Sequence, residues 1–374
     1  MGLFSSLFGK KEDTTDNSKN AVSSKTSNSS ANKPSLHLRG KADSNGLYPS
    51  ELVMLAVAEK YKTTETKFPG YLTHTYEVTN PQKMLKDLQS RGFIDIGNAK
   101  DILPNYKVSE LKEFASSLGV EVKGKKDDII SQLSEIEEDK LSTVVKERTW
   151  KLTDSGHVAL EANPYIQYFL DNHPYDVTVV GVNIWTVNED FVKNPKRPYR
   201  DIIYRQLNEK ENEASIAIQK NPGSGSYNTY NYCECYRLMG LFIEEEGKSY
   251  VNASDLYFQY IYKNINIHES LKLLISYKLF KNDKKQQQEA INRFCEEIQL
   301  YPFQRDELLR LIDELGIEQA AVRDAMITSF KRADDKGIMT EEETADFIIL
   351  ELSGEGDKAR DLAQGLAKKA LKKI

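Results

Sequence analysis

Residues 106–133, YKVSELKEFASSLGVEVKGKKDDIISQL, constrain the fold more than any other stretch of this chain. Apolar side chains recur at helical spacing at both ends of the segment, and Gly119 stands where a left-handed residue would end the first helix. The pattern therefore predicts two short helices joined by a tight turn. The apolar positions are Leu111, Phe114, Ala115 and Leu118 in the first helix and Ile129, Ile130 and Leu133 in the second.

The turn between these two helices combines a glycine with two lysines. Gly124 permits a sharp turn, so that Lys125 and Lys126 open the second helix at the surface. Asp127 and Asp128 follow in the first turn of that helix, near the positive end of its dipole. We expect the hairpin to present backbone N–H groups and ammonium groups side by side.

This arrangement resembles the SAP domain, a small DNA-binding helix-turn-helix module. The family's pattern fits without a gap as far as Leu133, although Lys107 replaces the usual Ser or Thr cap and Gln132 replaces a basic residue. The third departure is Ala115, which occupies an apolar position of the family. The resemblance implies a DNA-binding unit over residues 104–135. The matching positions are Glu110, Leu111, Lys112, Gly119, Gly124, Lys126, Ile129 and Leu133.

The charge of this unit is balanced. Five lysines stand against five carboxylates between Pro104 and Leu133, which gives a net charge of zero, and the whole chain carries −6. Because affinity for DNA depends on phosphate charge, a binding face must come from local clustering of lysines. We expect that face, assisted by helix N-terminal amides, at the residues of the turn. They are Lys123, Gly124, Lys125 and Lys126.

Residues 36–165 are expected to form one domain around this unit. Pro49 indicates the start of a first helix. A second helix is expected to have Asn80 as its N-cap, to begin with Pro81 and to end before Gly92. One strand is expected directly after this glycine. Its partner is expected only at the segment RTWKL, some fifty residues further on.

This order of elements is similar to that of winged-helix domains, in which a helix leads into a β-hairpin. The SAP-like unit would then be an insertion between the two strands. The resemblance implies that exposed Gln82, Lys83 and Lys86 lie on the helix that such domains place in the major groove. The same face also suits a protein-docking module, because Lys and Gln on a solvated helix need no ligand.

Residues 166–374 are expected to form an α-helical domain, so the chain as a whole is predicted to be mainly α. A short strand is the expectation for the β-branched segment 176–187, and a helix is expected to start near Asp190. The eight tyrosines between residues 227 and 262 stand at helical spacing, which favours a core role over a base-stacking surface.

The net charge of the sequence changes from negative to positive near its C-terminal end. Residues 334–357 carry nine carboxylates and one lysine, and the tail from Ala359 is basic and amphipathic. Such a tail suits phosphates or anionic lipid, but the leading expectation is that it folds back onto the acidic stretch.

Three cysteines are too few for a disulfide framework and point to the cytoplasm. Cys233 and Cys235 are expected to be buried thiols, because no second cysteine or histidine pair accompanies them as metal ligands. No stretch approaches the ~18 apolar residues of a membrane span, so stable membrane insertion is not expected.

Residues 1–35 are expected to form a flexible tether, because they are mostly polar. The first residues, MGLFSSLFGKK, match an N-myristoylation pattern. They could also form a peptide that touches a membrane weakly, but the leading expectation is a frayed terminus.

The sequence shows no set of residues that predicts catalysis. The five histidines lie far apart, and no nucleophile with a base, paired carboxylates or Walker sequence is present. We therefore predict no catalytic residues, no metal and no cofactor.

The prediction is a cytoplasmic, non-enzymatic DNA-binding protein with little sequence preference. In its order of segments the chain resembles the SAP-containing proteins of Gram-positive bacteria and their phages. The helical half would mediate self-association or dock another protein. Two alternatives stay open: an interaction or scaffold protein in which the SAP-like unit is only structural, and an enzyme with an unrecognised site in the C-terminal half.

Overall fold

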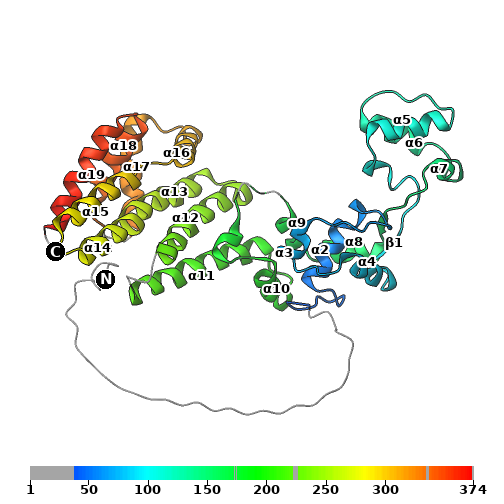
Figure 1. Ribbon diagram of the computed structural model, residues 1–374, viewed down its shortest axis with the longest axis horizontal. Coiled ribbons are helices and arrows are strands. Elements are labelled where there is room, and N and C mark those ends of the chain that lie inside the picture. The colour runs from blue at the N-terminus through cyan, green and yellow to red at the C-terminus, as the bar shows by residue number, and fades with distance from the viewer. Residues whose placement is uncertain (1–37, 172, 174, 222–225, 334–336, 373–374) are drawn as a thin grey trace, which may run out of the picture. The chain divides into compact units, whose positions relative to one another are not determined.

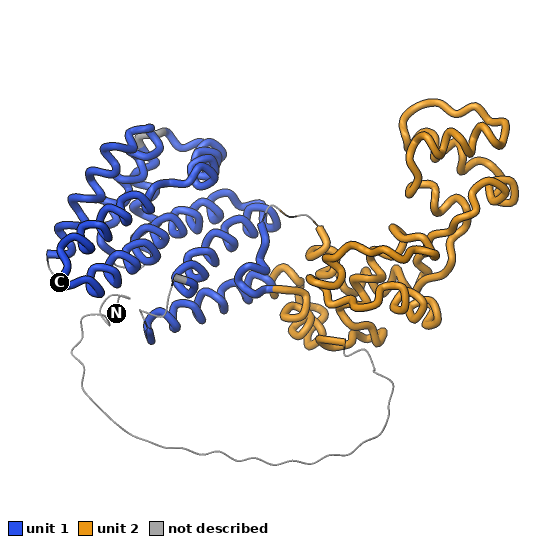
Figure 2. Tube along the Cα trace, viewed as in Figure 1, with its two compact units in different colours: residues 1–28, 174–182, 203–374 blue, residues 29–173, 183–202 orange. Residues whose placement is uncertain are grey.

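The computed structural model of the protein describes residues 38–171, 173, 175–221, 226–333 and 337–372. The expected tether over residues 1–35 lies outside the described residues. The described residues are mainly helical, with one two-stranded sheet, so the prediction of a mainly α fold is confirmed (Figure 1). The described chain divides into an N-terminal unit within residues 29–173 and 183–202 and a C-terminal unit within residues 174–182 and 203–374 (Figure 2).

The N-terminal unit is built around α2 (Pro49–Val57), the helix that Pro49 announces in the sequence. The side chains of residues 52–55 are fully buried, so this helix is covered on every side rather than along one stripe. It packs against α4 (Pro81–Ser90), α8 (Asp154–Glu161) and α9 (Tyr165–Leu170). Helix α2 is therefore the centre of the hydrophobic core of this unit.

Helix α4 begins and ends where the sequence predicts. Asn80 Oδ1 accepts a hydrogen bond from the Lys83 N–H at 3.0 Å, and Pro81 occupies the first helical position. Gly92 has a φ of +81°, a conformation that an L side chain rarely adopts, and it turns the chain from the helix into β1 (Ile94–Ile96).

The two predicted strands pair with each other. Strand β1 runs antiparallel to β2 (Trp150–Leu152), with Ile94 opposite Leu152 and Ile96 opposite Trp150. Helix α8 then starts directly after β2, at Asp154 rather than at the expected His157. Its Gly156 lies so close to the strand that an added Cβ would be 2.2 Å from the Phe93 carbonyl oxygen.

The segment between the two strands forms a small core of its own, which we call the insert (residues 98–145). Its elements are η2 (Leu103–Asn105), α5 (Val108–Ser117), α6 (Lys126–Ser134) and α7 (Glu138–Val144). The two helices predicted for residues 106–133 are α5 and α6. The buried residues of the insert core are Ala99, Ile102, Leu103, Tyr106, Leu111, Ala115, Ile129, Leu133, Leu141 and Val145.

The strand expected over residues 176–187 is wrong. The segment instead forms the 3-10 turn η3 (Val177–Val180) and then α10 (Ile184–Lys193), so that helix also starts before the expected Asp190. Asn183 Oδ1 accepts from the N–H groups of Trp185 and Thr186, both at 3.1 Å, and this local cap outweighs the β propensity of a short run. Of these two elements, η3 belongs to the C-terminal unit and α10 to the N-terminal unit, whose remaining elements are η1 (Ala58–Lys60) and α3 (Gly70–His74).

The C-terminal unit is a succession of helices from residue 203 on (Figure 1). Its most extensive helix pair is α12 with α13. Gly240 allows these helices to approach closely, because an added Cβ there would lie 3.1 Å from the Ala253 carbonyl oxygen. The helices are α11 (Tyr199–Lys220), α12 (Ser226–Gly247), α13 (Tyr250–Lys263), α14 (Ser270–Leu279), α15 (Lys284–Glu297), α16 (Pro302–Leu315), α17 (Gln319–Arg332), α18 (Glu341–Leu352) and α19 (Gly356–Leu371).

A π-helix, η4 (Asn264–Glu269), joins α13 to α14 without a break. Asn266 lies within it and is fully buried. Its Nδ2 donates to Thr344 Oγ1 at 2.8 Å, and its Oδ1 accepts from the Met339 N–H at 3.1 Å. The widened turn therefore holds the segment that leads into α18.

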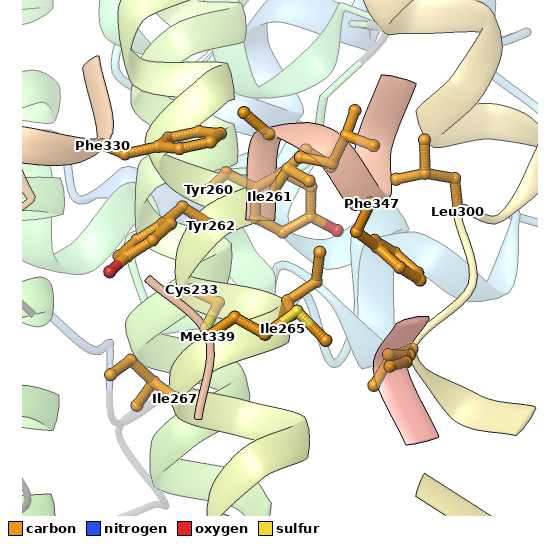
Figure 3. Close-up of a cluster of buried hydrophobic side chains, with 14 of the residues drawn as sticks. Cys233, Tyr260, Ile261, Tyr262, Ile265, Ile267, Leu300, Phe330, Met339 and Phe347 are labelled. Carbon is orange, nitrogen blue, oxygen red and sulfur yellow. The ribbon is translucent and has the colours of Figure 1, made fainter. Parts of the chain in front are cut away.

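Aromatic and aliphatic side chains fill the core of this unit (Figure 3). Tyr262 stacks on Phe330 with ring centroids 4.8 Å apart, and Cys233 and Cys235 are buried thiols, as predicted. The expectation that the tyrosines are core is right for only part of the set. Tyr232, Tyr257, Tyr260 and Tyr262 are buried, whereas Tyr227, Tyr230 and Tyr250 are exposed.

The basic tail folds back as expected. Helix α19 packs against α18, the helix that carries much of the acidic stretch, and Lys369 Nζ lies 3.7 Å from a Glu343 carboxylate oxygen. Ala363 and Ala367 of α19 are fully buried. The amphipathic pattern of the tail is thus used for packing inside the unit.

The close approach at Gly156 gives a stability test. We expect Gly156→Ala to lower the free energy of unfolding of the N-terminal unit by about 2–3 kcal/mol, because the new methyl group collides with backbone. Gly70→Ala is the matched control, since its Cβ would meet only ordinary contacts with His74, and it should change stability by less than about 0.5 kcal/mol. Urea unfolding followed by tryptophan fluorescence measures both, because Trp150 and Trp185 lie in this unit. Equal midpoints for the two variants would contradict the packing described here.

Candidate nucleic-acid interface

The turn between α5 and α6 depends on two left-handed glycines. Gly119 ends α5 with a φ of +70°, and Gly124 precedes α6 with a φ of +108°. An added Cβ at Gly124 would lie 2.5 Å from Asp128 Oδ2, so this site needs glycine for space as well as for conformation. Asp128 comes this close because its carboxylate accepts the Lys125 N–H at 2.8 Å.

Gln132 fixes the other side of the turn. Its Oε1 accepts from the Lys123 N–H at 3.2 Å, and its Nε2 donates to the carbonyl oxygens of Lys123 and Asp128, both at 2.8 Å. This glutamine stands where the SAP pattern has a basic residue. Its amide is used to hold the turn in shape, which is a structural role that the sequence did not suggest.

The three lysines of the turn have different surroundings. Lys126 Nζ donates to the Pro104 carbonyl oxygen at 2.6 Å and so fastens α6 to η2. Lys123 Nζ lies 2.9 Å from Glu121, but both side chains are 79% exposed, so this pair contributes little in water. Lys125 is exposed, and its side chain makes no hydrogen bond or ion pair within the part of the chain that the structure describes.

The backbone amides expected at this turn are only partly available. Those of Lys123 and Lys125 are taken by Gln132 and Asp128. The N–H groups of the first turn of α6, a helix of nine residues, have no partner among the described residues and lie at the positive end of its dipole. The cation available beside them is Lys125.

The second group of predicted residues lies on α4. Lys83 and Lys86 are one turn apart and exposed, and within the described chain neither side chain makes an ion pair. No hydrogen bond or ion pair of the described residues joins them to the turn of the insert. The structure thus brings Lys123, Gly124, Lys125 and Lys126 together at one turn and keeps Lys83 and Lys86 as a separate surface.

Glu147 joins the insert to the rest of its unit, a role that sequence reasoning missed. Its carboxylate accepts from Lys62 Nζ at 2.6 Å and from the Tyr106 hydroxyl at 2.8 Å. These two hydrogen bonds, the one from Lys62 above all, hold the pKa of Glu147 below its usual value. Nothing in the local sequence reveals this contact, because the partners lie 85 and 41 residues away.

A buried titratable pair in the C-terminal unit bears on the enzyme alternative. His268 Nδ1 lies 2.6 Å from Thr229 Oγ1, and burial lowers the pKa of His268 to about 4. Burial raises the pKa of Glu269 to about 7, although Lys272, at 3.0 Å, opposes this shift. Neither side chain lines the apolar groove that residues of α16, α17 and α18 form in this unit.

No protein-family model, curated protein or solved structure matches this chain. The described residues contain no group of three or more His, Cys, Asp and Glu side chains placed to hold a metal ion. No helix among them is long and apolar enough to cross a bilayer. The function is therefore argued from the geometry of the turn itself.

The different surroundings of Lys126 and Lys125 predict different effects of their removal. Lys126→Ala should destabilise α6 locally by about 1 kcal/mol, because the hydrogen bond to Pro104 is lost. Amide exchange in residues 126–134 should then be roughly fivefold faster, measured by hydrogen exchange and mass spectrometry. Lys125→Ala is the matched control and should leave the exchange rates unchanged. Equal acceleration in both variants would show that the turn does not distinguish the two lysines.

Proposed function

We propose that this protein binds nucleic acid, as duplex DNA, weakly and with little sequence preference, through the turn of the insert, and that it does so without catalysis. The proposal takes the insert as a SAP-like module, over residues 104–135, within a winged-helix-like domain of residues 36–165. The helical region of residues 166–374 would then serve self-association or a protein partner.

The observation that carries this proposal is the position of Lys125. Its ammonium group is exposed and has no partner among the described residues, and it stands at the N-cap of α6 beside amides that lack partners. A cation and helix N-terminal amides at one place favour a phosphate group, because charge and hydrogen-bond donors act on the same oxygens. The ammonium group of Lys123 is close in sequence, and its ion pair with Glu121 is exposed to solvent.

The charge balance of the hairpin limits the affinity. Five lysines and five carboxylates cancel between residues 104 and 133. Asp128 accepts an amide hydrogen bond at the turn, but its negative charge stays there. We therefore expect about two phosphate contacts from the turn, which corresponds to a roughly tenfold loss of affinity between 50 and 200 mM salt.

Fluorescence anisotropy of a short labelled duplex, titrated with the full chain at these two salt concentrations, tests the proposal. Lys125→Glu should weaken binding by about tenfold at low salt and reduce the salt dependence by about one phosphate contact. Lys140→Glu is the matched control, because Lys140 is an exposed lysine of the insert that lies outside the turn and the net charge changes equally. It should change affinity by less than about twofold.

A third variant, Lys83→Glu with Lys86→Glu, tests the second surface. If α4 contacts the duplex, its effect should add to that of Lys125→Glu, because the two groups share no contact that would couple them. A normal affinity for this variant would restrict the interface to the insert.

The second candidate function is a protein-interaction or scaffold role in which the insert is only structural. The internal use of Gln132 and the zero net charge of the hairpin favour it. Binding that is absent, or that does not change with salt, would overturn the nucleic-acid proposal and leave this role in its place.

A further inference from the structure

A half-open apolar groove of about 310 Å³ lies within the C-terminal unit, where the ends of α16 and α18 meet the start of α17. Pockets for drug-sized ligands are typically roughly 300–1,000 Å³ and largely enclosed. This groove is at the lower limit and open along one side, so it suits a few apolar side chains of a peptide. Its lining residues are Leu309, Ile312, Asp313, Gly316, Ile317, Val322, Ile349, Leu352 and Ser353.

Six of these nine residues carry branched aliphatic side chains, so the floor of the groove is apolar. Leu309 is 44% exposed at its edge, whereas Leu308 and Leu311 of the same helix are buried. The groove therefore offers apolar surface that the described part of the chain leaves uncovered.

The rim of the groove is negative. Asp313 lines it, and both α16 and α18 end at it, so the negative ends of two helix dipoles point towards the same place. Arg305 donates to the Leu352 carbonyl oxygen at 3.1 Å and satisfies one of these groups. The positive end of α17 is also near, but its N-cap residue is the acidic Glu318. An occupant with cations next to apolar side chains would complement this surface.

We propose that residues 3–11 of this same chain, LFSSLFGKK, dock in the groove. A helix over residues 3–8 would place Leu3, Phe4, Leu7 and Phe8 on a single face, and Lys10 and Lys11 follow after Gly9. The apolar side chains would fill the groove, and the lysines would face Asp313 and the two helix ends. The proposal does not depend on nucleic-acid binding.

Residues 3–11 and the groove belong to one chain, so docking within a single molecule is favoured over docking between two molecules. Residues 12–37 separate the segment from the described chain, a length that reaches up to roughly 90 Å when extended and about 28 Å on average. A groove of this size gives only weak binding between separate molecules. A tether raises the effective concentration of the segment to about the millimolar range, so that weak docking is still populated.

Site-specific photo-crosslinking of the full chain tests the proposal. A p-benzoylphenylalanine at position 309 stands at the exposed edge of the groove, where the substitution disturbs little packing. Irradiation at low micromolar protein concentration should give crosslinks to residues 3–11 in the band of monomer mass. Phe4→Ser with Phe8→Ser should reduce the yield about tenfold or more, because two buried aromatic side chains are lost. Ser5→Ala with Ser6→Ala is the matched control and should leave it unchanged.

A second measurement avoids the unnatural residue. Hydrogen exchange of peptides covering residues 309–317 should be faster in the Phe4→Ser/Phe8→Ser variant than in the original chain and in the serine control. Crosslinks to residues 3–11 in a band of dimer mass would assign the groove to a second copy and overturn the intramolecular proposal. Crosslinks elsewhere, no crosslinks, or unchanged exchange would overturn the proposal altogether.

Discussion

Three cross-strand pairs, between residues 94–96 and 150–152, hold the two ends of the insert together. Closing so long a segment of chain costs entropy, which two short strands alone offset poorly. The pairing is supported by the close packing of Gly156 on the Phe93 carbonyl group and by Glu147, which binds Lys62 on one side and Tyr106 on the other. Asn105 adds a third link between the insert and the rest of the unit, because its Nδ2 donates to the Glu59 carbonyl oxygen at 3.2 Å.

A separate core makes the insert a suitable support for a binding turn. Its ten buried residues position α5 and α6 without help from the core around α2. The turn itself is then held by Gln132, Asp128 and Lys126, each of which spends its polar groups on the backbone. Lys125 is left pointing to solvent in a fixed frame. Lys126 therefore has a structural role, whereas the neighbouring Lys125 is available to a ligand. The zero net charge of the hairpin does not reveal this difference.

The features that the sequence predicted correctly are those set by residues acting on their own segment of backbone. The bounds of α4 follow from Asn80, Pro81 and Gly92, and the shape of the turn follows from Gly119 and Gly124, because each of these residues acts on its own backbone. The pairing of β1 with β2 was also predictable, since each segment reads as a strand by itself.

Contacts between distant residues decided the rest. The π-helix was missed because Asn266 is held by Met339 and Thr344, more than 70 positions further on. Lys126 was expected to face solvent, but its ammonium group donates to Pro104, 22 residues earlier. The strand expected over residues 176–187 failed for the opposite reason, because the Asn183 cap is a local feature that was underweighted against β-branched composition.

The central claim is that a phosphate group meets this protein at the first turn of α6. Amide chemical shifts of the full ¹⁵N-labelled chain, recorded while a short DNA duplex is added at low salt, test it residue by residue. We expect the largest changes at the N–H groups of Lys126, Asp127 and Asp128, with the amides of α7 unaffected. Changes confined to the C-terminal unit, or none at the turn while the duplex binds, would contradict it.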